Sequence, residues 1–493
     1  MKHYLGVDIG TFETKGVIVS ATGEIVAQAS RAHRMQVPEP GWAEHDAEQD
    51  WWGDFVFVTK KMLAESGIAP SSIAAVGASG IGPCMLPVDE AGTPLMNAVL
   101  YGVDTRASRE IDDLTRQIGA DVVLERCGNA LTSQAVGPKI LWLKRNRPEI
   151  FARTHKILNS SSFLVHRLTG RYTIDHYSAG NFSPFYLADA QAWSDELAPG
   201  IIAMDQLPEL MCTTEIAGHF TAKAAAETGL AEGTPVIAGT IDAAAEAVSV
   251  GVLNAGDLML MYGSTIFIIL ITPERVRDAR LWYAPWLFPG QHGAMAGLST
   301  SGTLTHWFRE NFARELPAET AVIDLAKEAE ASPPGAKGLV LLPYFSGERT
   351  PIHDTKAKGI LFGLDLTHAR GDMFRAVLEG IAHGTRHVFE TYAEAGEAPR
   401  IIYAVGGGTR NRVWSEATSD ISGLSQVLRQ KTIGASYGDA FLAALALGDV
   451  TPADLGRWNP VASSITPRPD LKAMYDRQHA VFRGLYTATR PFL

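Results

Sequence analysis

Cysteine is scarce in this sequence, and its scarcity narrows the classes of protein to consider. The 493 residues include three cysteines, Cys84, Cys127 and Cys212, which are odd in number and far apart. A disulfide framework needs pairs and a zinc site needs a cluster, so we expect neither. Reduced, dispersed thiols are typical of the cytoplasm, where we expect the protein to work.

Features of membrane and nucleic-acid binding are also missing. No apolar run approaches the roughly 20 residues that span a bilayer, and the opening MKHYLGVDIG leads directly into a predicted strand, so we expect no signal peptide. The formal net charge is −11, whereas nonspecific binding to nucleic acid or an anionic membrane requires a basic surface. An anionic ligand would have to be held by local donors.

The first pattern present is a β-hairpin at residues 4–19, YLGVDIGTFETKGVIV. Its turn contains donor residues, namely Gly10, Thr11, Thr14 and Lys15. Backbone N–H groups, hydroxyls and an ammonium group together favour a polyphosphate. Asp8 ends the first run and is suited to hold Mg²⁺, because magnesium takes one or two carboxylates with waters and phosphate oxygens. An ordinary edge hairpin, with Asp8 and Thr11 in turn hydrogen bonds, explains the stretch equally well.

The hairpin pattern returns at residues 258–270, LMLMYGSTIFIIL, and the two turn glycines lie 253 residues apart. The second turn also contains a glycine and two hydroxyl residues, Gly263, Ser264 and Thr265. The repetition predicts two related halves. We therefore expect domains at residues 1–248 and 249–493, with the ligand site in the cleft between them.

Three acidic or basic side chains are candidates for chemistry. Asp104 and Arg106 follow an apolar run and can grip several hydroxyls of a polyol. A local salt bridge at the start of a helix is the alternative. Asp242 follows the buried strand PVIAG and begins an Ala-rich helix. It is suited to take a proton from a substrate hydroxyl, and helix capping is its structural alternative.

Two glycine-rich loops complete the set of motifs. The loop ASGIGP at residues 78–83 has neither the glycine order of a dinucleotide fingerprint nor the lysine of a P-loop, so at best it lines a pocket. Three glycines at residues 406–408 let a flat adenine ring lie on the backbone. Helices are predicted at four ranges, the second capped by serine and ended by Gly170: residues 137–146, 162–168, 373–388 and 437–447.

In this order, and across nearly the whole chain, the motifs resemble those of the FGGY carbohydrate kinases. The segments that carry the resemblance are VDIGTFETK, PGWAEHD, GTPVIAGTIDAA, LLPYFSGERTP, VGGGTRN and the C-terminal signature GILFGLDLTHARGDMFRAVLE at residues 359–379. The resemblance implies an α/β protein with the two-domain, ribonuclease H-like fold of actin and hexokinase. Mixed β-sheets flanked by helices would close around ATP and a small sugar or polyol.

The resemblance also implies roles for the residues above. Asp8 would hold Mg²⁺, and Asp242 would be the catalytic base. The phosphates of ATP would contact the two turns, through Thr11, Thr14, Lys15, Gly263, Ser264 and Thr265. The adenosine would lie against Gly407, Gly408 and Asn411. The sugar would be bound by Gly82, Tyr101, Asp104 and Arg106.

The sugar pocket departs from the xylulokinase branch, which the chain resembles in overall look. That branch has Gln-Met-His-Gly where this chain has Ile81-Gly82-Pro83-Cys84, and a Trp where this chain has Gly102. The N-terminal signature around Lys139 is also only partial. We therefore expect a kinase for a small ketose, such as the pentulose xylulose, with ribulose, fuculose, erythrulose, glycerol and gluconate as alternatives.

Two other classes of protein fit parts of the sequence. A nucleotide-gated regulator would use the same two-domain clamp without phosphoryl transfer, but it has no need of a base such as Asp242. A glycoside hydrolase would use Asp104 and Asp242 as its carboxylate pair, but it leaves the two phosphate-type hairpins unexplained. A homodimer is common among the relatives, and no segment of the sequence indicates an interface.

Overall fold

Strand β1 (His3–Ile9) lies inside the first of two large sheets. The computed structural model of the protein describes residues 2–317 and 320–493. Strand order in this sheet is β13-β14-β5-β1-β2-β3, with β15 also paired to β5. The predicted hairpin is confirmed, since β1 pairs antiparallel with β2 and parallel with β5. The other strands are β2 (Glu13–Ser20), β3 (Ile25–Ala32), β5 (Ile73–Gly80), β13 (Ile216–His219), β14 (Pro235–Ile237) and β15 (Thr240–Ile241).

The second large sheet repeats the pairing of the first. Its order is β18-β19-β17-β16-β22-β23-β24, and the second predicted hairpin is confirmed as β16 with β17. In both sheets the hairpin is followed by two parallel strands and an antiparallel edge strand. The chain thus contains two halves of one topology. The strands are β16 (Asp257–Tyr262), β17 (Ile266–Thr272), β18 (Trp282–Pro285), β19 (His292–Leu298), β22 (Ile401–Val405), β23 (Gln426–Arg429) and β24 (Val461–Ile465).

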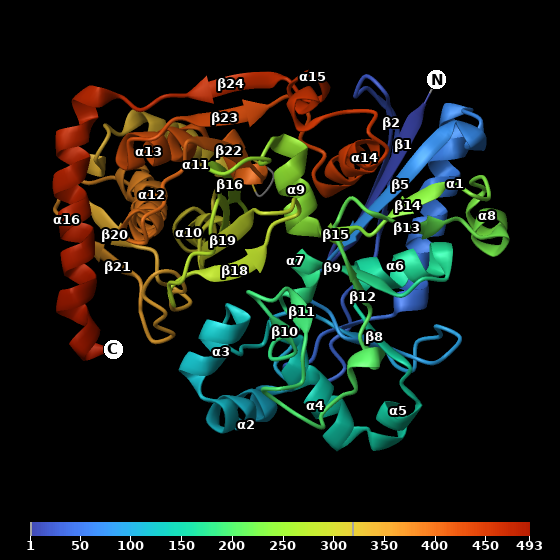
Figure 1. Ribbon diagram of the computed structural model, residues 1–493. Helices are drawn as coiled ribbons and strands as arrows, with labels where there is room; N and C mark the ends of the chain where they lie inside the picture. The colour runs from blue at the N-terminus through green and yellow to red at the C-terminus, as the bar shows by residue number, and fades with distance from the viewer. Residues whose placement is uncertain (1, 318–319) are drawn as a thin grey trace.

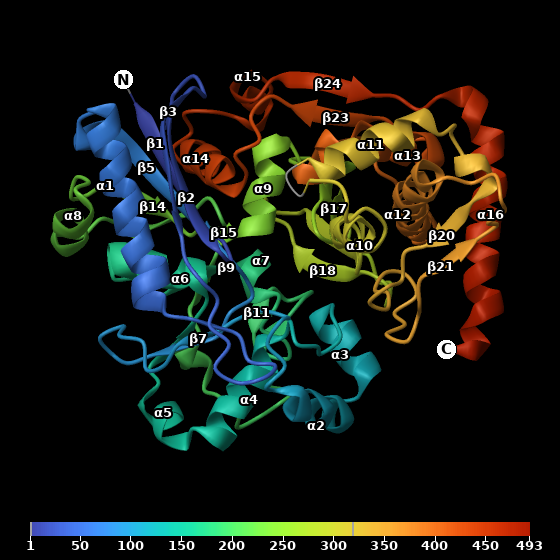
Figure 2. The ribbon, with the colours of Figure 1, turned by 180° about the vertical axis from the view of Figure 1, so that it is seen from behind.

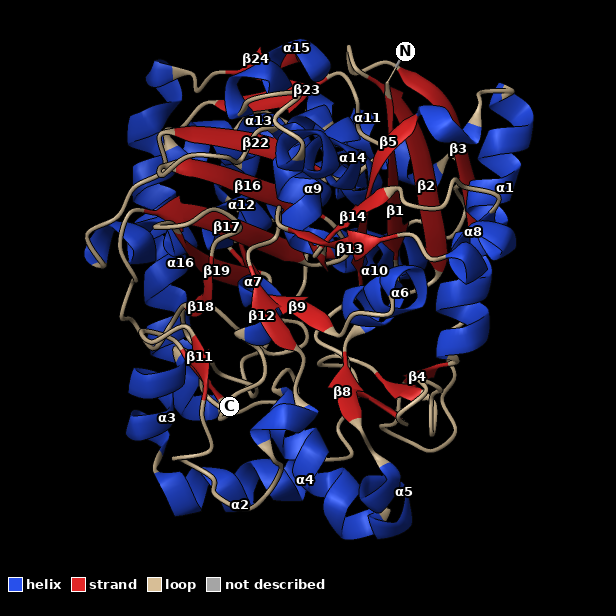
Figure 3. Ribbon diagram, turned by 45° about the vertical axis from the view of Figure 1, so that its right-hand side comes forward, coloured by secondary structure: helices blue, strands red, loops and turns tan. Residues whose placement is uncertain are grey.

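Two helices, α9 (Asp242–Val250) and α14 (Ala435–Ala446), lie between the sheets (Figures 1 and 3). Although α14 belongs to the second half of the sequence, it packs on β1 and β5 of the first sheet and on α9. Both helices are rich in alanine, so they approach their neighbours closely. Their apolar side chains form one core with residues of both sheets.

Glycines make this close packing possible. A Cβ atom on Gly6 would lie 1.9 Å from the carbonyl oxygen of Ser436, and one on Gly438 would lie 1.9 Å from the carbonyl oxygen of Ala245. Real Cβ atoms do not come this near to a backbone oxygen. Strand β1 and helices α9 and α14 are therefore held at a separation that only glycine permits at these positions.

The outer faces of the sheets are covered by other helices (Figure 2). The first sheet packs against α1 (Asp54–Ser66), α6 (Ser160–Thr169) and α8 (Ala222–Thr228). The second packs against α10 (Gly302–Phe312), α11 (Ala321–Ala331), α12 (Arg370–Glu394) and α13 (Arg412–Ser422). A π-helix at Ala47–Gly53 leads into α1. The chain ends with α15 (Leu455–Trp458) and α16 (Lys472–Thr489).

A helical lobe with its own core is inserted after β5 and lies at the bottom of Figure 1. Its helices are α2 (Ser108–Ile118), α3 (Ala120–Cys127), α4 (Val136–Asn146), α5 (Pro148–Arg153) and α7 (His176–Ala179). Short two-stranded sheets connect the lobe and the main sheets. They are β4 (Glu44–His45) with β7 (Ala98–Val99), β6 (Leu86–Val88) with β8 (Lys156–Leu158), β9 (Thr173–Asp175) with β12 (Glu209–Met211), and β10 (Tyr186–Leu187) with β11 (Ala192–Trp193). A further pair, β20 (Val340–Leu342) with β21 (Ile360–Phe362), lies in the second half of the chain, where β20 packs on α12 and α16.

All four predicted helices are present, as α4, α6, α12 and α14. The prediction of a serine cap on α6 is wrong. Asn159 is the capping residue, and its side chain accepts the N–H of Ser162. Gly170 ends the helix in the left-handed conformation, as predicted. In the part of the chain that is described, no helix is both long and apolar enough to cross a bilayer.

Replacing Gly438 by alanine tests the close contact between α14 and α9. We expect Gly438→Ala to lower the free energy of unfolding by about 3 kcal/mol or more, because the added methyl group overlaps the α9 backbone. Gly484→Ala is the matched control, since a Cβ at Gly484 in α16 meets nothing within 4 Å. Alanine should add about 0.5–1 kcal/mol there through helix propensity. Urea unfolding followed by tryptophan fluorescence measures both, and equal stabilities would contradict the packing argument.

Candidate active site

The first sheet brings Asp8 and Asp242 to one edge. Asp8 lies near the end of β1, opposite Ser79 on β5. Thr240 on β15 pairs with Ser79 from the other side, and α9 starts at Asp242, two residues later. Strand ends that share a neighbour place their following residues close together. The pairing therefore assembles two carboxylates that stand 234 positions apart in the sequence (242 − 8).

Burial gives these carboxylates unusual proton affinities. Burial and the charge of Glu246 raise the pKa of Asp8 to about 7, and Lys15 opposes the shift. Burial and the charge of Asp8 raise the pKa of Asp242 well above its usual value. Pairs of like charges in a buried place are typical of active sites, because each group makes the other a better proton acceptor.

A third carboxylate, Asp439 of α14, lies beside them. Its side chain is buried, and its Oδ2 accepts a 2.7 Å hydrogen bond from the hydroxyl of Ser79. Burial and the charges of Asp8 and Asp242 raise the pKa of Asp439 well above its usual value. Asp439 is not among the residues predicted from the sequence, since it lies in an apolar helix. The signal that could have found it is a lone carboxylate within the apolar run YGDAFLAALAL.

The second turn is supported by the start of α10. The carbonyl oxygen of Gly263 accepts the N–H of Gly302 at 3.0 Å. The carbonyl oxygen of Ser264 accepts the N–H of Thr303 at 3.1 Å and the hydroxyl of Thr303 at 2.9 Å. A hydrogen bond from the N–H of Gly263 to the carbonyl of Thr265 closes the turn. The turn is therefore fixed by backbone contacts on one side.

The three-glycine segment follows β22, next to the second hairpin. A Cβ on Gly406 would lie 2.6 Å from the carbonyl oxygen of Tyr262, the residue before the second turn, and Gly406 has a φ of 91°. A Cβ on Gly408 would lie 2.9 Å from the Cβ of Tyr262, whereas one on Gly407 would meet nothing within 4 Å. The structure thus brings together the second turn and the predicted adenosine segment, and leaves the backbone at Gly407 open.

Three predicted ligands make contacts within the protein. The hydroxyl of Thr14 donates to Asp54 Oδ2 at 3.1 Å and is buried. Lys15 Nζ lies 3.6 Å from Glu13 Oε2, with its side chain about half exposed. The side chain of Asn411 caps α13 by accepting a backbone N–H. Thr14 and Asn411 are therefore bonded within the protein, while Lys15 holds its ammonium group beside Glu13 next to the first turn.

Asp104 and Arg106 form a buried ion pair, which is the structural alternative considered for this motif. The two side chains are fully buried and 2.7 Å apart, and α2 begins two residues after Arg106. Asp104 Oδ2 also accepts the N–H of Ala43 at 2.7 Å. The guanidinium lies over the ring of Trp42. Its Nη1 atom is buried without a hydrogen-bond partner among the described residues.

Tyr101 and Gly82 lie close to Asp242. The hydroxyl of Tyr101 is 3.1 Å from the hydroxyl of Thr11. This contact joins the loop that contains Tyr101 to the first turn. Burial and the charge of Asp242 raise the pKa of Tyr101. A Cβ on Gly82 would lie 2.7 Å from Ile241, the residue before Asp242. Two of the four predicted sugar-binding residues, Gly82 and Tyr101, therefore lie near the start of α9.

Comparison with known proteins identifies the fold and the chemistry of this site. Models of the N-terminal and C-terminal domains of the FGGY family of carbohydrate kinases match residues 3–249 and 258–447. The chain belongs to this family. It is therefore a carbohydrate kinase, a phosphotransferase that uses ATP, and the predicted two-domain α/β fold is confirmed.

Relatives of known activity differ in their named substrates. Xylulose kinase from Bacillus subtilis is 28% identical over 99% of this chain and 98% of its own length. Gluconokinase from the same organism is 27% identical over 92% of this chain and 89% of its own length. The crystal structure of xylulose kinase from Rhodospirillum rubrum superposes with a TM-score of 0.94 at 31% identity, covering 100% of this chain and 99% of that one.

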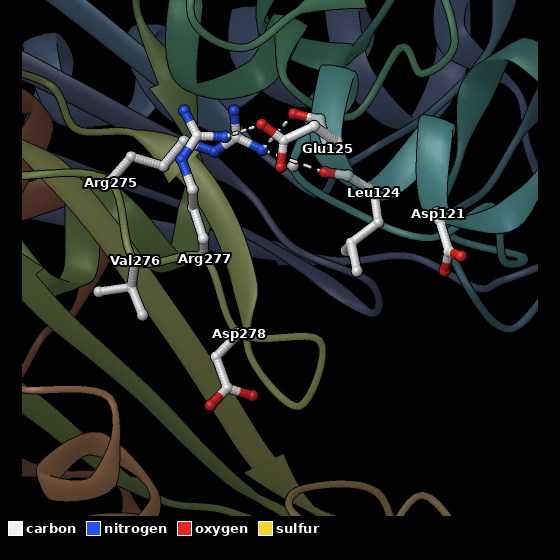
Figure 4. A pocket seen from close by; sticks show the side chains of 8 residues that line it. Asp121, Leu124, Glu125, Arg275, Val276, Arg277 and Asp278 are labelled. Atoms are coloured by element: carbon white, nitrogen blue, oxygen red, sulfur yellow. Dashed lines mark hydrogen bonds and ion pairs between the residues drawn. The ribbon is translucent and has the colours of Figure 1, made fainter.

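A cavity of about 120 Å³ lies elsewhere, between α3 and the loop after β17 (Figure 4). Arg275 crosses it, donating to the carbonyl oxygens of Leu124 and Glu125 and pairing with Asp189 at 2.8 Å. Arg277 pairs with Glu125 and Asp189. The carboxylates of the site do not line this cavity. The ion pairs around this cavity connect the helical lobe to the second half of the chain.

Replacing Asp439 by asparagine tests the cost of the buried carboxylates. The pKa of Asp439 is higher in the folded protein than its unfolded value of 3.8, so ionised Asp439 destabilises the folded protein. This destabilisation begins as the pH rises above 3.8 and grows until the pH reaches the folded-state pKa. We expect Asp439→Asn to raise the melting temperature, and to raise it more at pH 8 than at pH 5. Asp112→Asn, at an exposed position of α2, is the control and should leave the melting temperature unchanged. A lower melting temperature for Asp439→Asn at pH 8 would contradict the prediction.

Proposed function

We propose that this carbohydrate kinase transfers the γ-phosphoryl group of Mg-ATP to a hydroxyl of a small ketose, and that a pentulose such as xylulose is its substrate. The observation that supports the proposal is the position of Asp242. It lies at the start of α9, beside the partly buried Asp8 and the loop that contains Gly82. The domains are proposed to be residues 1–248 and 249–493. The sugar and metal would lie on the first and the adenosine on the second.

Asp242 is proposed to accept the proton of the attacking hydroxyl. Its Oδ1 atom is held by the N–H of Ala243 at 2.7 Å, which fixes the carboxylate. Burial and neighbouring negative charge raise its pKa, so it is a stronger proton acceptor than an exposed aspartate. Phosphoryl transfer depends mainly on positioning and charge neutralisation, and the base is the protein group that contacts the nucleophile.

Asp8 is proposed to hold Mg²⁺ together with the phosphates of ATP. Its Oδ1 atom is buried and has no hydrogen-bond partner among the described residues, which fits a carboxylate that receives a cation. Those residues contain no group of three or more His, Cys, Asp or Glu arranged around a metal. This agrees with Mg²⁺, which uses one or two carboxylates and fills its other positions with water and phosphate. Bound Mg²⁺ would neutralise charge on the phosphates.

The nature of the sugar pocket supports a polar, several-hydroxyl substrate. In this proposal Tyr101 and Nη1 of Arg106 donate hydrogen bonds to hydroxyls of the substrate. Asp242 accepts a hydrogen bond from a substrate hydroxyl. The relatives named above act on xylulose and on gluconate. We propose the pentulose first, and ribulose, fuculose, erythrulose, glycerol and gluconate as alternatives. We also propose that the enzyme works in the cytoplasm, and a homodimer remains a prediction.

A panel of acceptors tests the substrate. The purified protein with Mg-ATP is given pentuloses, tetruloses, hexuloses, polyols and aldonates, and ADP release is followed with a coupled assay. We expect one or two pentuloses to stimulate ADP release at least about 100-fold over the sugar-free rate, because acceptor hydroxyls complete the site. Stimulation by gluconate or glycerol alone would overturn the pentulose assignment and keep the kinase.

Substitution of Asp242 tests the base. We expect Asp242→Asn to lower kcat by about 10²–10⁴-fold with the best acceptor, because the amide cannot take the proton. Calorimetry should show ATP affinity within about 3-fold of the unsubstituted protein, since Asp242 contacts the nucleophile rather than the nucleotide. Asp112→Asn, an exposed carboxylate, is the control. Near-normal turnover in Asp242→Asn would remove Asp242 from the mechanism.

A further inference from the structure

The carbonyl groups of Gly10, Thr11 and Phe12 in the first turn each have a hydrogen-bond partner outside the hairpin. The carbonyl oxygen of Gly10 lies 2.9 Å from Nε2 of His33, and that of Thr11 lies 3.0 Å from Nε2 of His45. The carbonyl oxygen of Phe12 accepts the backbone N–H of His33 at 3.0 Å. Three successive peptide groups are thereby fixed by two histidines, neither of which belongs to the hairpin.

The second contact of each ring fixes its protonation. Nδ1 of His45 lies 3.1 Å from Nε1 of Trp51, which can only donate, so the hydrogen of His45 is on Nε2. Nδ1 of His33 lies 2.8 Å from the Asp54 carboxylate. Both nitrogens of His33 thus face acceptors, and the ring is an imidazolium that donates twice. Each Nε2–H group donates to the turn.

The charges around the two rings agree with this arrangement. Burial would lower the pKa of His33, but its bonds to Asp54 and Gly10 and the charge of Asp50 raise it. Arg31 faces Asp54 from β3, with Nε of Arg31 3.1 Å from Oδ1 of Asp54. Burial and the positive charge of His33 lower the pKa of His45 to about 4. One imidazole is charged and the other neutral, 4.9 Å apart.

Fixing the carbonyl groups also fixes the N–H groups. In a trans peptide the C=O and N–H bonds point to opposite sides. With the carbonyls of Gly10 and Thr11 bonded to the histidines, the N–H groups of Thr11 and Phe12 point to the other side of the turn. Successive backbone N–H groups that converge on one side form an anion-binding concavity.

The second half of the chain supports the same reading. There the carbonyls of Gly263 and Ser264 are bonded from one side by Gly302 and Thr303 at the start of α10. The equivalent turn is thus supported in the same way by a different structure. What the two halves share is the fixed direction of the turn carbonyls, whereas the groups that fix them differ.

We propose that His33 and His45 are positioning residues that aim the N–H groups of the first turn at the phosphates of ATP. Neither histidine touches the nucleotide in this proposal. They act through the carbonyls of Gly10 and Thr11, and Asp54 and Trp51 hold them in place. The inference rests on the proposed function of the first turn.

Pairs of substitutions at His33 and His45 test whether the hydrogen bond to the turn carbonyl is needed, as distinct from the imidazole ring itself. Nε2 of glutamine lies as many bonds from Cβ as Nε2 of histidine, and Nδ2 of asparagine matches Nδ1. His33→Gln therefore keeps the donor to Gly10, while His33→Asn keeps only the donor to Asp54. His45→Gln keeps the donor to Thr11, and His45→Phe removes it. In each pair, one variant keeps the hydrogen bond to the turn carbonyl and the other loses it.

Calorimetry with Mg-ATP and the full-length protein is the readout. We expect His33→Asn and His45→Phe to weaken the Kd for Mg-ATP by about 10-fold, the loss of one well-formed hydrogen bond that aims a donor. His33→Gln and His45→Gln should stay within about 3-fold of the unsubstituted protein. KM for the sugar should change less than about 2-fold in all four. A purely structural role would weaken both ligands together.

Dependence on pH gives a second readout. As pH rises through the raised pKa of His33, the ring loses one of its two donors and must release Asp54 or Gly10. Mg-ATP affinity of the unsubstituted protein should therefore fall on the alkaline side, and His33→Gln should not show this fall. An equal alkaline fall in both proteins would remove His33 from the phosphate site.

The outcomes distinguish this inference from the proposed function. If Gln and Asn or Phe variants bind Mg-ATP equally, the positioning role is wrong. If no sugar stimulates ADP release but the Kd values separate as expected, the proposed substrate fails and the positioning role stands. If the unsubstituted protein does not bind Mg-ATP, both fail. Should His45→Phe not fold, the His33 pair decides.

Discussion

Repulsion between buried carboxylates is the constraint on which the rest of this structure depends. Asp8, Asp242 and Asp439 lie close to one another, Asp439 buried and the other two partly buried, and the loss of hydration raises the pKa of each. Like charges would separate if their supports could move. The supports are a strand and two helices that glycines bring almost into backbone contact. Rigid packing therefore holds the three carboxylates close together although their negative charges repel one another. This repulsion raises the affinity of the carboxylates for a cation or a proton.

The duplicated sheets explain why the site has two similar turns. Each half supplies a hairpin whose turn carbonyls are bonded from one side. Only the first half has an aspartate two residues before its turn glycine, since Met261 occupies the matching position in β16. The first half thus supplies Asp8 and Asp242, whereas the second supplies Asp439 and an open glycine backbone. The two halves share the hairpin and differ in the side chains near its turn.

Prediction from the sequence succeeded where the signal is local. Both hairpins, the helices α4, α12 and α14, and the position of Asp242 follow from alternation, glycine and alanine within short windows. Prediction failed where a residue depends on distant partners. Nothing near Asp439 shows that β5 will place Ser79 against it, and nothing near His33 shows that it will reach Gly10. The cap of α6 was assigned to serine because Asn159 precedes three serines that are equally good caps.

The packing of α14 has a consequence for how the chain is made. The first sheet begins with the third residue, but the helix that covers its inner face ends at Ala446. A ribosome that adds about 5–20 residues per second needs tens of seconds to reach that point. The inner face of the first sheet is uncovered until α9 is made, and it then has only α9 to cover it until α14 follows, so the nascent chain presents an apolar surface for most of its synthesis. Helix α14 therefore completes the core of the first sheet, and a truncation that removes α14 would expose that core.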